Sequence, residues 1–123
     1  MQNTIDKKTV FDKSDLMERL DNDYFLAVEL AKLFITDARE KLVSLQSAIE
    51  QQDGPEIEKT AHALKGAASN LSAGKVRYIA GLVEIAGKNN DIDTLSAAAK
   101  MLKPAIDELI DVLDMKIINP VED

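Results

Sequence analysis

The chain has 123 residues, a mass of 13.5 kDa and a net charge of −7, and its length is that of a single domain. The acidic balance argues against nucleic-acid binding and against docking on anionic membranes, because both depend on an excess of Lys and Arg. The chain has no Cys and a single His, which excludes disulfides, thiolate nucleophiles and multi-His metal sites. It has no apolar run of ~20 residues that would span a bilayer and no secretory signal at its polar N-terminus, so we expect a cytoplasmic protein.

Hydrophobic residues recur with the period of amphipathic helices, roughly 3.6 residues, and no segment alternates as a strand does. Ser14 is expected to cap a short first helix that ends near Leu20. Asn22 or Asp23 is expected to cap a second helix, which reaches about residue 34. From residue 36 or 37 the chain either starts a further helix or continues as one long bent helix to about residue 49.

Gly54 and Pro55 mark the next break, and Pro55 suits the first position of a helix that runs to about residue 71. A joint at residues 72–74 leads into a helix over 76–88. Asp91 or Asp93 is expected to cap the last helix, and Pro104 within it should kink it or divide it near residue 101.

Long amphipathic segments joined by short connections favour antiparallel neighbours. We therefore predict an all-α fold, an antiparallel up-and-down four-helix bundle over residues 11–116, with a short extra N-terminal helix across one end. The alternative is an irregular α bundle that a break at Pro104 opens. Residues 1–10 and 117–123 are expected to be tails.

The histidine, His62, is predicted to project into solvent from the helix that begins at Pro55. At about 100° per residue, His62 lies roughly 140° from Ile57 in the apolar stripe of that helix, with Gly66 at about 180° and Ser69 at about 120°. Lys65 at about 80° and Lys59 at about −160° flank this group. The expected apolar stripe comprises Ile57, Ala61, Leu64, Ala68 and Leu71.

Gly66 is unusual at this place, because a glycine in an exposed helix interior costs about 0.5–1 kcal/mol relative to alanine. Its missing side chain leaves the imidazole one turn away open to another molecule, and Lys65 lies within reach of any group attached to the ring. Neutral imidazole is a good nucleophile near neutral pH, and phosphoryl transfer depends mostly on positioning and charge screening. The pattern therefore indicates nucleophilic phosphoryl transfer. The alternative is that His62 is an ordinary solvated residue and that the lysines form a solvated face.

The segment Ala61–Leu71, AHALKGAASNL, resembles the signature of histidine-containing phosphotransfer (HPt) domains, which is His-x-Leu-Lys-Gly followed by small residues. The resemblance covers about residues 11–115, because the N-terminal pattern of the family is also matched. One departure is Ser72, which stands where the family often has a glycine, ten residues after the histidine. The N-terminal match consists of Phe11, Asp12, Asp23, Leu26, Leu30 and Phe34.

By this resemblance His62 is the phosphorylated residue, Lys65 is the cation beside the phosphoryl group, and Gly66 is the small residue that exposes the ring. Ser69 occupies the later small position of the family, where its hydroxyl is also expected to be able to hydrogen-bond near the ring. Lys59 is the second lysine of the expected environment. The resemblance implies a phosphorelay intermediate of two-component signalling. A receiver domain with an aspartyl phosphate and a magnesium ion would supply the phosphoryl group, and another receiver would take it. It also implies a monomeric phosphocarrier without kinase or phosphatase activity, cofactor or metal of its own.

Complexes of the family form through the second helix, so we expect the receivers to contact it. If its leucines face inward, Tyr24, Val28 and Ile35 form an apolar patch on the outward face. The alternative is that the helix is covered on both sides. The leucines expected to face inward are Leu26, Leu30 and Leu33.

Two other functions fit the same residues. One is the phosphotransfer module of a chemotaxis-type histidine kinase, which receives its phosphoryl group from an ATP-binding domain. The other is a helical adaptor that is not phosphorylated, in which His62→Gln would leave partner binding unchanged.

Overall fold

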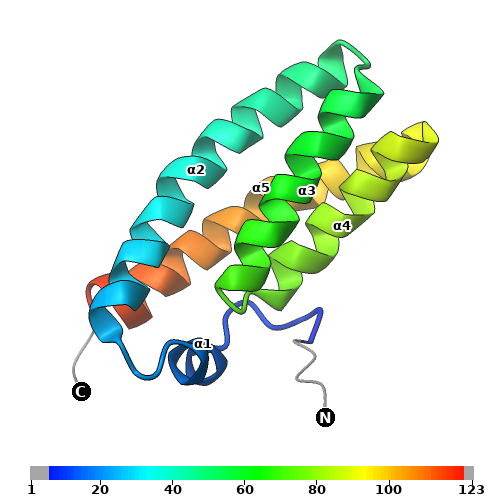
Figure 1. Ribbon diagram of the computed structural model, residues 1–123. Helices are drawn as coiled ribbons and strands as arrows, with labels where there is room; N and C mark the ends of the chain where they lie inside the picture. Colours follow the sequence, from blue (N-terminus) through cyan, green and yellow to red (C-terminus); the bar gives the residue numbers. More distant parts are fainter. Residues whose placement is uncertain (1–5, 121–123) are drawn as a thin grey trace.

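The computed structural model describes residues 6–120 and places five α-helices in that range (Figure 1). They are α1 (Lys13–Arg19), α2 (Tyr24–Glu50), α3 (Gly54–Asn70), α4 (Gly74–Asn89) and α5 (Ile92–Leu113), and a π-helical turn, η1 (Asp114–Ile118), follows the last. No strand occurs within residues 6–120. The all-α fold class is confirmed.

Four of the helices begin at an aspartate whose carboxylate accepts a hydrogen bond from the backbone N–H three residues later. These N-caps are Asp12, Asp23, Asp53 and Asp91. The predicted cap at Ser14 is wrong, because Ser14 lies inside α1 and it is the Asp12 carboxylate that accepts from the backbone N–H of Asp15. A carboxylate at this position also interacts favourably with the positive end of the helix dipole.

Neither of the two interruptions considered from the sequence divides a helix. Helix α2 is continuous over 27 residues, so the alternative of one long helix is the correct one. Helix α5 runs unbroken through Pro104, and the predicted division near residue 101 is wrong. Pro104 is exposed, whereas Leu102, Ala105 and Ile106 on either side are buried in the core. Their burial offsets the hydrogen bond that the proline removes from the helix.

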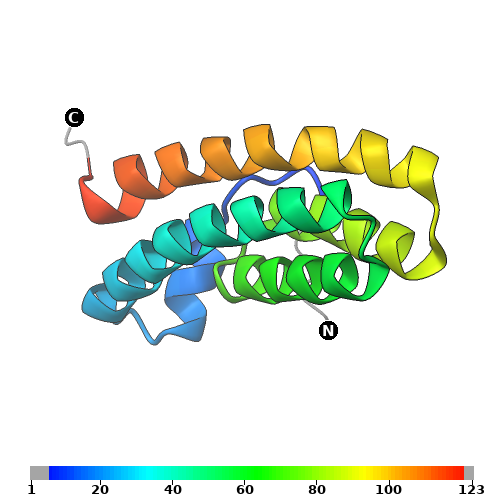
Figure 2. The same cartoon turned by 90° about the horizontal axis from the view of Figure 1, so that it is seen from above.

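Helices α2, α3 and α4 lie side by side, and α5 crosses behind them (Figure 1). In the view from above, α5 runs along one side of the molecule (Figure 2). The contact between α3 and α4 is the most extensive one, and the turn η1 fills the space between α2 and α5 at the C-terminal end. The core combines aliphatic side chains of α3, α4 and α5 with small residues of α2, whose buried positions include Ala27, Ala31, Phe34, Ala38, Leu45 and Ala48.

Helix α1 lies across the end of the molecule at which α3 turns into α4 (Figure 1). The backbone of the segment before it is hydrogen-bonded to that joint, from Lys75 N to Thr9 O at 2.8 Å and from Asp12 N to Ser72 O at 3.0 Å. At the other terminus Ile117 is fully buried. The described parts of the two expected tails, residues 6–10 and 117–120, therefore include packed positions. The remaining tail residues, 1–5 and 121–123, lie outside the described range.

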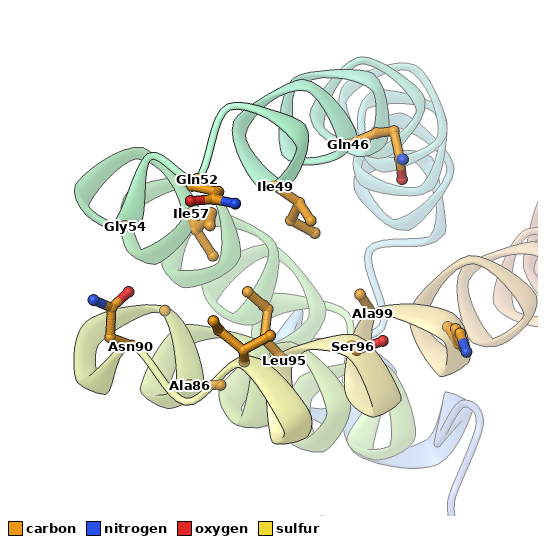
Figure 3. A pocket seen from close by; sticks show the side chains of 13 residues that line it. Gln46, Ile49, Gln52, Gly54, Ile57, Ala86, Asn90, Leu95, Ser96 and Ala99 are labelled. Atoms are coloured by element: carbon orange, nitrogen blue, oxygen red, sulfur yellow. The ribbon is translucent and has the colours of Figure 1, made fainter.

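At the opposite end, a cavity of about 520 Å³ lies where the end of α2, the start of α3, the end of α4 and the start of α5 meet (Figure 3). Ile49, Ile57 and Leu95 form apolar parts of its wall. Across residues 6–120, none of the helices combines the length and the apolar character needed to span a membrane.

Candidate functional site

His62 projects from the middle of α3 away from the core, as predicted, and 67% of its side chain is exposed. Gly66 lies one turn further along, and a Cβ atom at that position would meet nothing within 4 Å. No packing contact inside the protein therefore requires a glycine there. The open space next to the ring is available to another molecule. The expected apolar stripe of α3 is confirmed, since Ile57, Ala61, Leu64, Ala68 and Leu71 are all buried.

The imidazole of His62 is held by a carboxylate from the neighbouring helix. Nδ1 of His62 lies 2.8 Å from Oε2 of Glu84 on α4, and the other oxygen of the same carboxylate, Oε1, lies 2.7 Å from Nζ of Lys65. The Glu84 side chain is only 15% exposed. Its Oε1 atom is shielded from solvent and finds no hydrogen-bond donor within residues 6–120 besides the Lys65 ammonium. One carboxylate thus bridges the imidazole and the lysine.

The Lys65 ammonium beside Glu84 holds the pKa of that carboxyl below its ordinary value, and the hydrogen bond from His62 acts in the same direction. Partial burial opposes both effects without reversing them. Glu84 is therefore ionised at neutral pH. An ionised carboxylate only accepts hydrogen bonds.

Because Glu84 only accepts, Nδ1 of the neutral imidazole must carry the proton. The lone pair then belongs to Nε2, on the opposite side of the ring from Glu84. The hydrogen bond fixes both the tautomer and the orientation of the ring. The arrangement presents an exposed nitrogen nucleophile with a cation beside it.

The other site residues predicted from the sequence differ in their relation to the imidazole. Lys65 is within the network described above. Lys59 is exposed on the preceding turn of α3. Ser69 is exposed, but its hydroxyl donates to the carbonyl oxygen of Lys65 at 3.0 Å and not to the imidazole.

The sequence did not identify Glu84, which lies 22 residues after His62 on another helix. One signal was present in the sequence of α4. Glu84 is the one acidic residue of that helix, which also contains three basic residues, Lys75, Arg77 and Lys88.

The predicted partner patch on α2, which comprises Tyr24, Val28 and Ile35, lies on the flank of the helix that faces the C-terminal turn and not on the flank beside α3. Val28 and Ile35 are half-buried, and the Tyr24 hydroxyl donates to the carbonyl oxygen of Ile117, so this flank faces the C-terminal turn. Of the leucines expected to face inward, Leu30 is half-buried against the core, whereas Leu26 is 41% exposed and Leu33 is 66% exposed. The large leucine side chains indicated the buried face of α2 wrongly, because the helix packs closely against its neighbours through small alanines.

Leu33 instead lies beside α3, on the flank of α2 that faces the histidine helix. It lines a groove of about 310 Å³ together with Ala67 and Asn70 of α3. The exposed apolar surface next to the histidine helix is therefore this flank of α2.

Ser72 adopts a left-handed backbone conformation with φ of 57° and is fully buried. This conformation explains why a glycine suits the position. The serine hydroxyl donates to Asp15 Oδ2 at 2.6 Å and accepts from Arg19 Nη2 at 2.5 Å. Arg19 Nη2 also donates to the carbonyl oxygens of Ser69 and Asn70 at the end of α3. The hydroxyl thus ties α1 to the end of the histidine helix.

Within residues 6–120, no cluster of three or more His, Asp or Glu side chains is arranged to hold a metal ion. The site geometry consists of an exposed imidazole, an orienting carboxylate and a lysine.

Comparison with known proteins identifies the family and the fold. Residues 29–115 match the family described as the Hpt domain, which is more than half of the chain, and the chain belongs to this family. Proteins of this family are phosphotransfer carriers that interact with receiver domains.

The chain is 25% identical over 103 residues to the phosphorelay intermediate protein rdeA of Dictyostelium discoideum. The match covers 84% of this chain and 41% of that protein, so the chain spans about two fifths of the length of this relative. The fold is similar to the crystal structure of histidine-containing phosphotransfer protein B from Pseudomonas aeruginosa, with a TM-score of 0.83 at 18% identity. That match covers 93% of this chain and 99% of the other.

Proposed function

We propose that this chain is a phosphorelay intermediate of two-component signalling, which accepts a phosphoryl group on Nε2 of His62 from the aspartyl phosphate of a receiver domain and passes it to another receiver. The observation that carries the proposal is the hydrogen bond between Nδ1 of His62 and Glu84, in a ring that is two-thirds exposed. It leaves Nε2 as the nucleophile. Membership of the Hpt family supports the proposal.

In the proposed step, the lone pair of Nε2 attacks the phosphorus atom in line with the bond to the aspartate oxygen. The N–P bond forms, the P–O bond breaks, and the aspartate leaves as a carboxylate. The proton on Nδ1 stays in its hydrogen bond to Glu84. The ring gains positive charge because both of its nitrogens are now substituted, and the Glu84 carboxylate at 2.8 Å stabilises that charge.

Lys65 supplies the positive charge for the transferred group. Its ammonium is 2.7 Å from Glu84 in the unphosphorylated protein and its side chain is 35% exposed. A phosphoryl group on the ring adds a dianion within reach of this lysine. The ammonium then moves from the carboxylate toward the phosphoryl oxygens, where charge-assisted hydrogen bonds are strong.

The receiver is proposed to cover His62 and the adjoining flank of α2. Leu33 and Leu26 on that flank are exposed, and Leu33 lines the groove between α2 and the histidine helix α3. Gly66 lets the partner approach the ring closely. We propose this docking surface in preference to the predicted patch of Tyr24, Val28 and Ile35, which lies on the other flank of α2.

The finer features of the proposal concern the protein as a whole. The carrier acts without kinase or phosphatase activity and without a cofactor of its own, and the receiver brings the magnesium ion. It acts as a monomer, and its partners are receivers of response regulators or hybrid histidine kinases. We also interpret the four long helices as an antiparallel up-and-down bundle with α1 as the extra N-terminal helix, which the contacts between α2 and α3, α3 and α4, and α4 and α5 support.

A phosphotransfer assay with a panel of phosphorylated receiver domains and magnesium tests this function. We expect the wild-type chain to take up label that is stable in alkali and lost in acid, as phosphohistidine is, and His62→Gln to take up none. No label from any receiver would contradict the proposal. Label from a kinase domain with ATP would then identify a kinase-fed module, and partner binding that is indifferent to His62→Gln would identify an adaptor.

A further inference from the structure

A second groove borders the phosphoacceptor site on the side away from α2. It has a volume of about 580 Å³ and runs along the outer face of α4, which lies beside α3 (Figure 1). Lys65, the lysine of the site, forms one of its walls. Tyr78, Leu82 and Ile85 form its apolar part, and Tyr78 and Ile85 are 43% and 58% exposed.

Gly81 lies in this groove, opposite Lys65, in the middle of α4. A Cβ atom there would meet only Cδ of Lys65 at 3.7 Å, which is an ordinary contact. A helix-interior glycine costs about 0.5–1 kcal/mol relative to alanine. Packing inside the protein does not explain it, in contrast to Gly87, where a Cβ would clash with Ile57 at 2.6 Å.

Gly66 and Gly81 therefore share one property. Each is an interior helical glycine that no internal contact requires, and they lie on the two helices that supply Lys65 and Glu84. Each keeps the surface low beside the site. A partner that approaches both helices closely explains the pair, whereas a partner confined to α2 and α3 explains only Gly66.

The groove is also positively charged, although the chain as a whole carries −7. The Lys7 ammonium lies 5.1 Å from the centre of the Tyr78 ring, and Arg77 is exposed beside it. The acidic residues near the groove are Asp6 in its wall and Glu84, whose carboxylate is already bound to Lys65 and His62. A surface of opposite charge is electrostatically complementary to this rim.

We propose that the footprint of the phosphodonor receiver extends from His62 across Lys65 onto this groove of α4, with an apolar side chain of the receiver over Gly81 and carboxylates of the receiver facing Lys7 and Arg77. The inference rests on the proposed function and names the part of the partner that it recognises. The apolar side chain packs against Tyr78, Leu82 and Ile85. The carboxylates fix the orientation and speed the encounter.

The test compares two variants of the groove with the wild type. Gly81→Leu fills the groove without an internal clash of its Cβ atom, and Arg77→Glu reverses the charge of the rim. Transfer is measured from the receiver that labels the wild-type chain fastest. We expect Gly81→Leu to lower kcat/KM about tenfold or more and Arg77→Glu to lower it about three- to tenfold, with a weaker dependence on salt.

Three controls separate docking from the reactivity of the histidine. Phosphoramidate, a small phosphoryl donor that needs no docking surface, should label both variants as fast as the wild type. Ala97→Leu on α5 places a leucine at another exposed site, and Arg39→Glu reverses an exposed charge on α2. Both of these variants should accept phosphoryl groups from the receiver at the wild-type rate.

The inference is overturned if both groove variants are labelled by the receiver as fast as the wild type. It is also overturned if Ala97→Leu and Arg39→Glu slow the transfer as much as the groove variants do. If the wild type is labelled by phosphoramidate but neither binds nor takes label from any receiver, the proposed function fails and the footprint fails with it.

Discussion

Removal of the Glu84 carboxylate tests the role of the network around His62 most directly. In Glu84→Ala, the imidazole loses the acceptor that lies 2.8 Å from Nδ1, and Lys65 loses its ion pair. The proton then distributes between Nδ1 and Nε2, and the ring is free to turn. Part of the population presents a protonated Nε2, which is not a nucleophile.

The size of the effect follows from the geometry. A hydrogen bond to a charged group contributes about 1.5–3 kcal/mol, and the lower end applies here because the ring is two-thirds exposed. About 1.4 kcal/mol corresponds to a tenfold change in rate. We expect Glu84→Ala to slow transfer to His62 about tenfold. Glu84→Gln keeps an oxygen that accepts from Nδ1 but no charge to stabilise the phosphorylated ring, and we expect it to slow transfer roughly threefold.

Two measurements check this prediction. Single-turnover transfer from a phosphorylated receiver gives the rate, and nitrogen NMR of the imidazole gives the tautomer. The matched control is Glu108→Ala, which removes the 2.9 Å ion pair between Lys75 of α4 and Glu108 of α5 without altering the surroundings of His62. The reasoning is refuted if Glu84→Ala retains both the wild-type rate and a ring protonated mainly on Nδ1.

Four further predictions follow from named contacts. Lys65→Ala should shorten the lifetime of the phosphorylated protein and slow its formation about tenfold, because it removes the ammonium that lies beside His62 and would neutralise the phosphoryl group. Label uptake and label decay measure the two effects. In urea denaturation, Ser72→Gly should lower the free energy of unfolding by about 1 kcal/mol and Ser72→Ala should lower it by about 2 kcal/mol. Both variants lose the hydrogen bonds to Asp15 and Arg19, but only glycine relieves the left-handed backbone. The opposite order of stabilities would contradict this account. Ile117→Ala should lower the free energy of unfolding by about 2–4 kcal/mol, because the side chain is fully buried. A change near zero would instead support the prediction that this segment is a tail. The pKa of Glu84 is lowered on folding, so its contribution to stability is complete above the ordinary glutamate value of 4.5 and is lost as the pH falls through the folded pKa. The difference in melting temperature between wild type and Glu84→Gln should therefore shrink below about pH 4.5, and a difference that grows there would show the wrong sign.

The sequence predicted the histidine helix well because its two faces differ clearly. Large apolar residues of α3 repeat on one side, and the opposite side carries His62, Gly66 and Ser69, so the helical period alone orients the ring. Gly66 was informative for the same reason. A glycine in an exposed helix interior is costly, so its presence signals a requirement from outside the chain.

Helix α2 shows where such reasoning fails. Its buried face consists largely of alanines, and its exposed face carries large hydrophobic residues, Phe25 at 77% and Leu33 at 66% exposure. Side-chain size therefore indicates the wrong face when a helix packs against its neighbours through small residues and carries its large hydrophobic residues at the surface. The misplaced inward face put the predicted patch on the flank of α2 opposite to the one we propose for docking.

Ser72 and Pro104 illustrate a second limit, which is that local rules are overruled by contacts distant in sequence. The left-handed conformation of Ser72 is compensated by Asp15 and Arg19, more than 50 residues earlier in the chain. Pro104 remains helical because the residues around it are buried against the other helices. Neither compensation has a sequence signal near the residue that it stabilises.

Glu84 shows the limit of considering one helix at a time, and the proposed chemistry depends on this residue. A helical period can place His62 at the surface, but it cannot show which ring nitrogen is free, because that depends on an acceptor from another helix. The crossing of α3 and α4 supplies that acceptor, 22 residues away, and the same carboxylate holds Lys65. The proposed nucleophile, Nε2 of His62, therefore depends on the pair of helices and not on the signature in α3 alone. A transplanted segment with the sequence of α3 alone would expose an imidazole without fixing its tautomer.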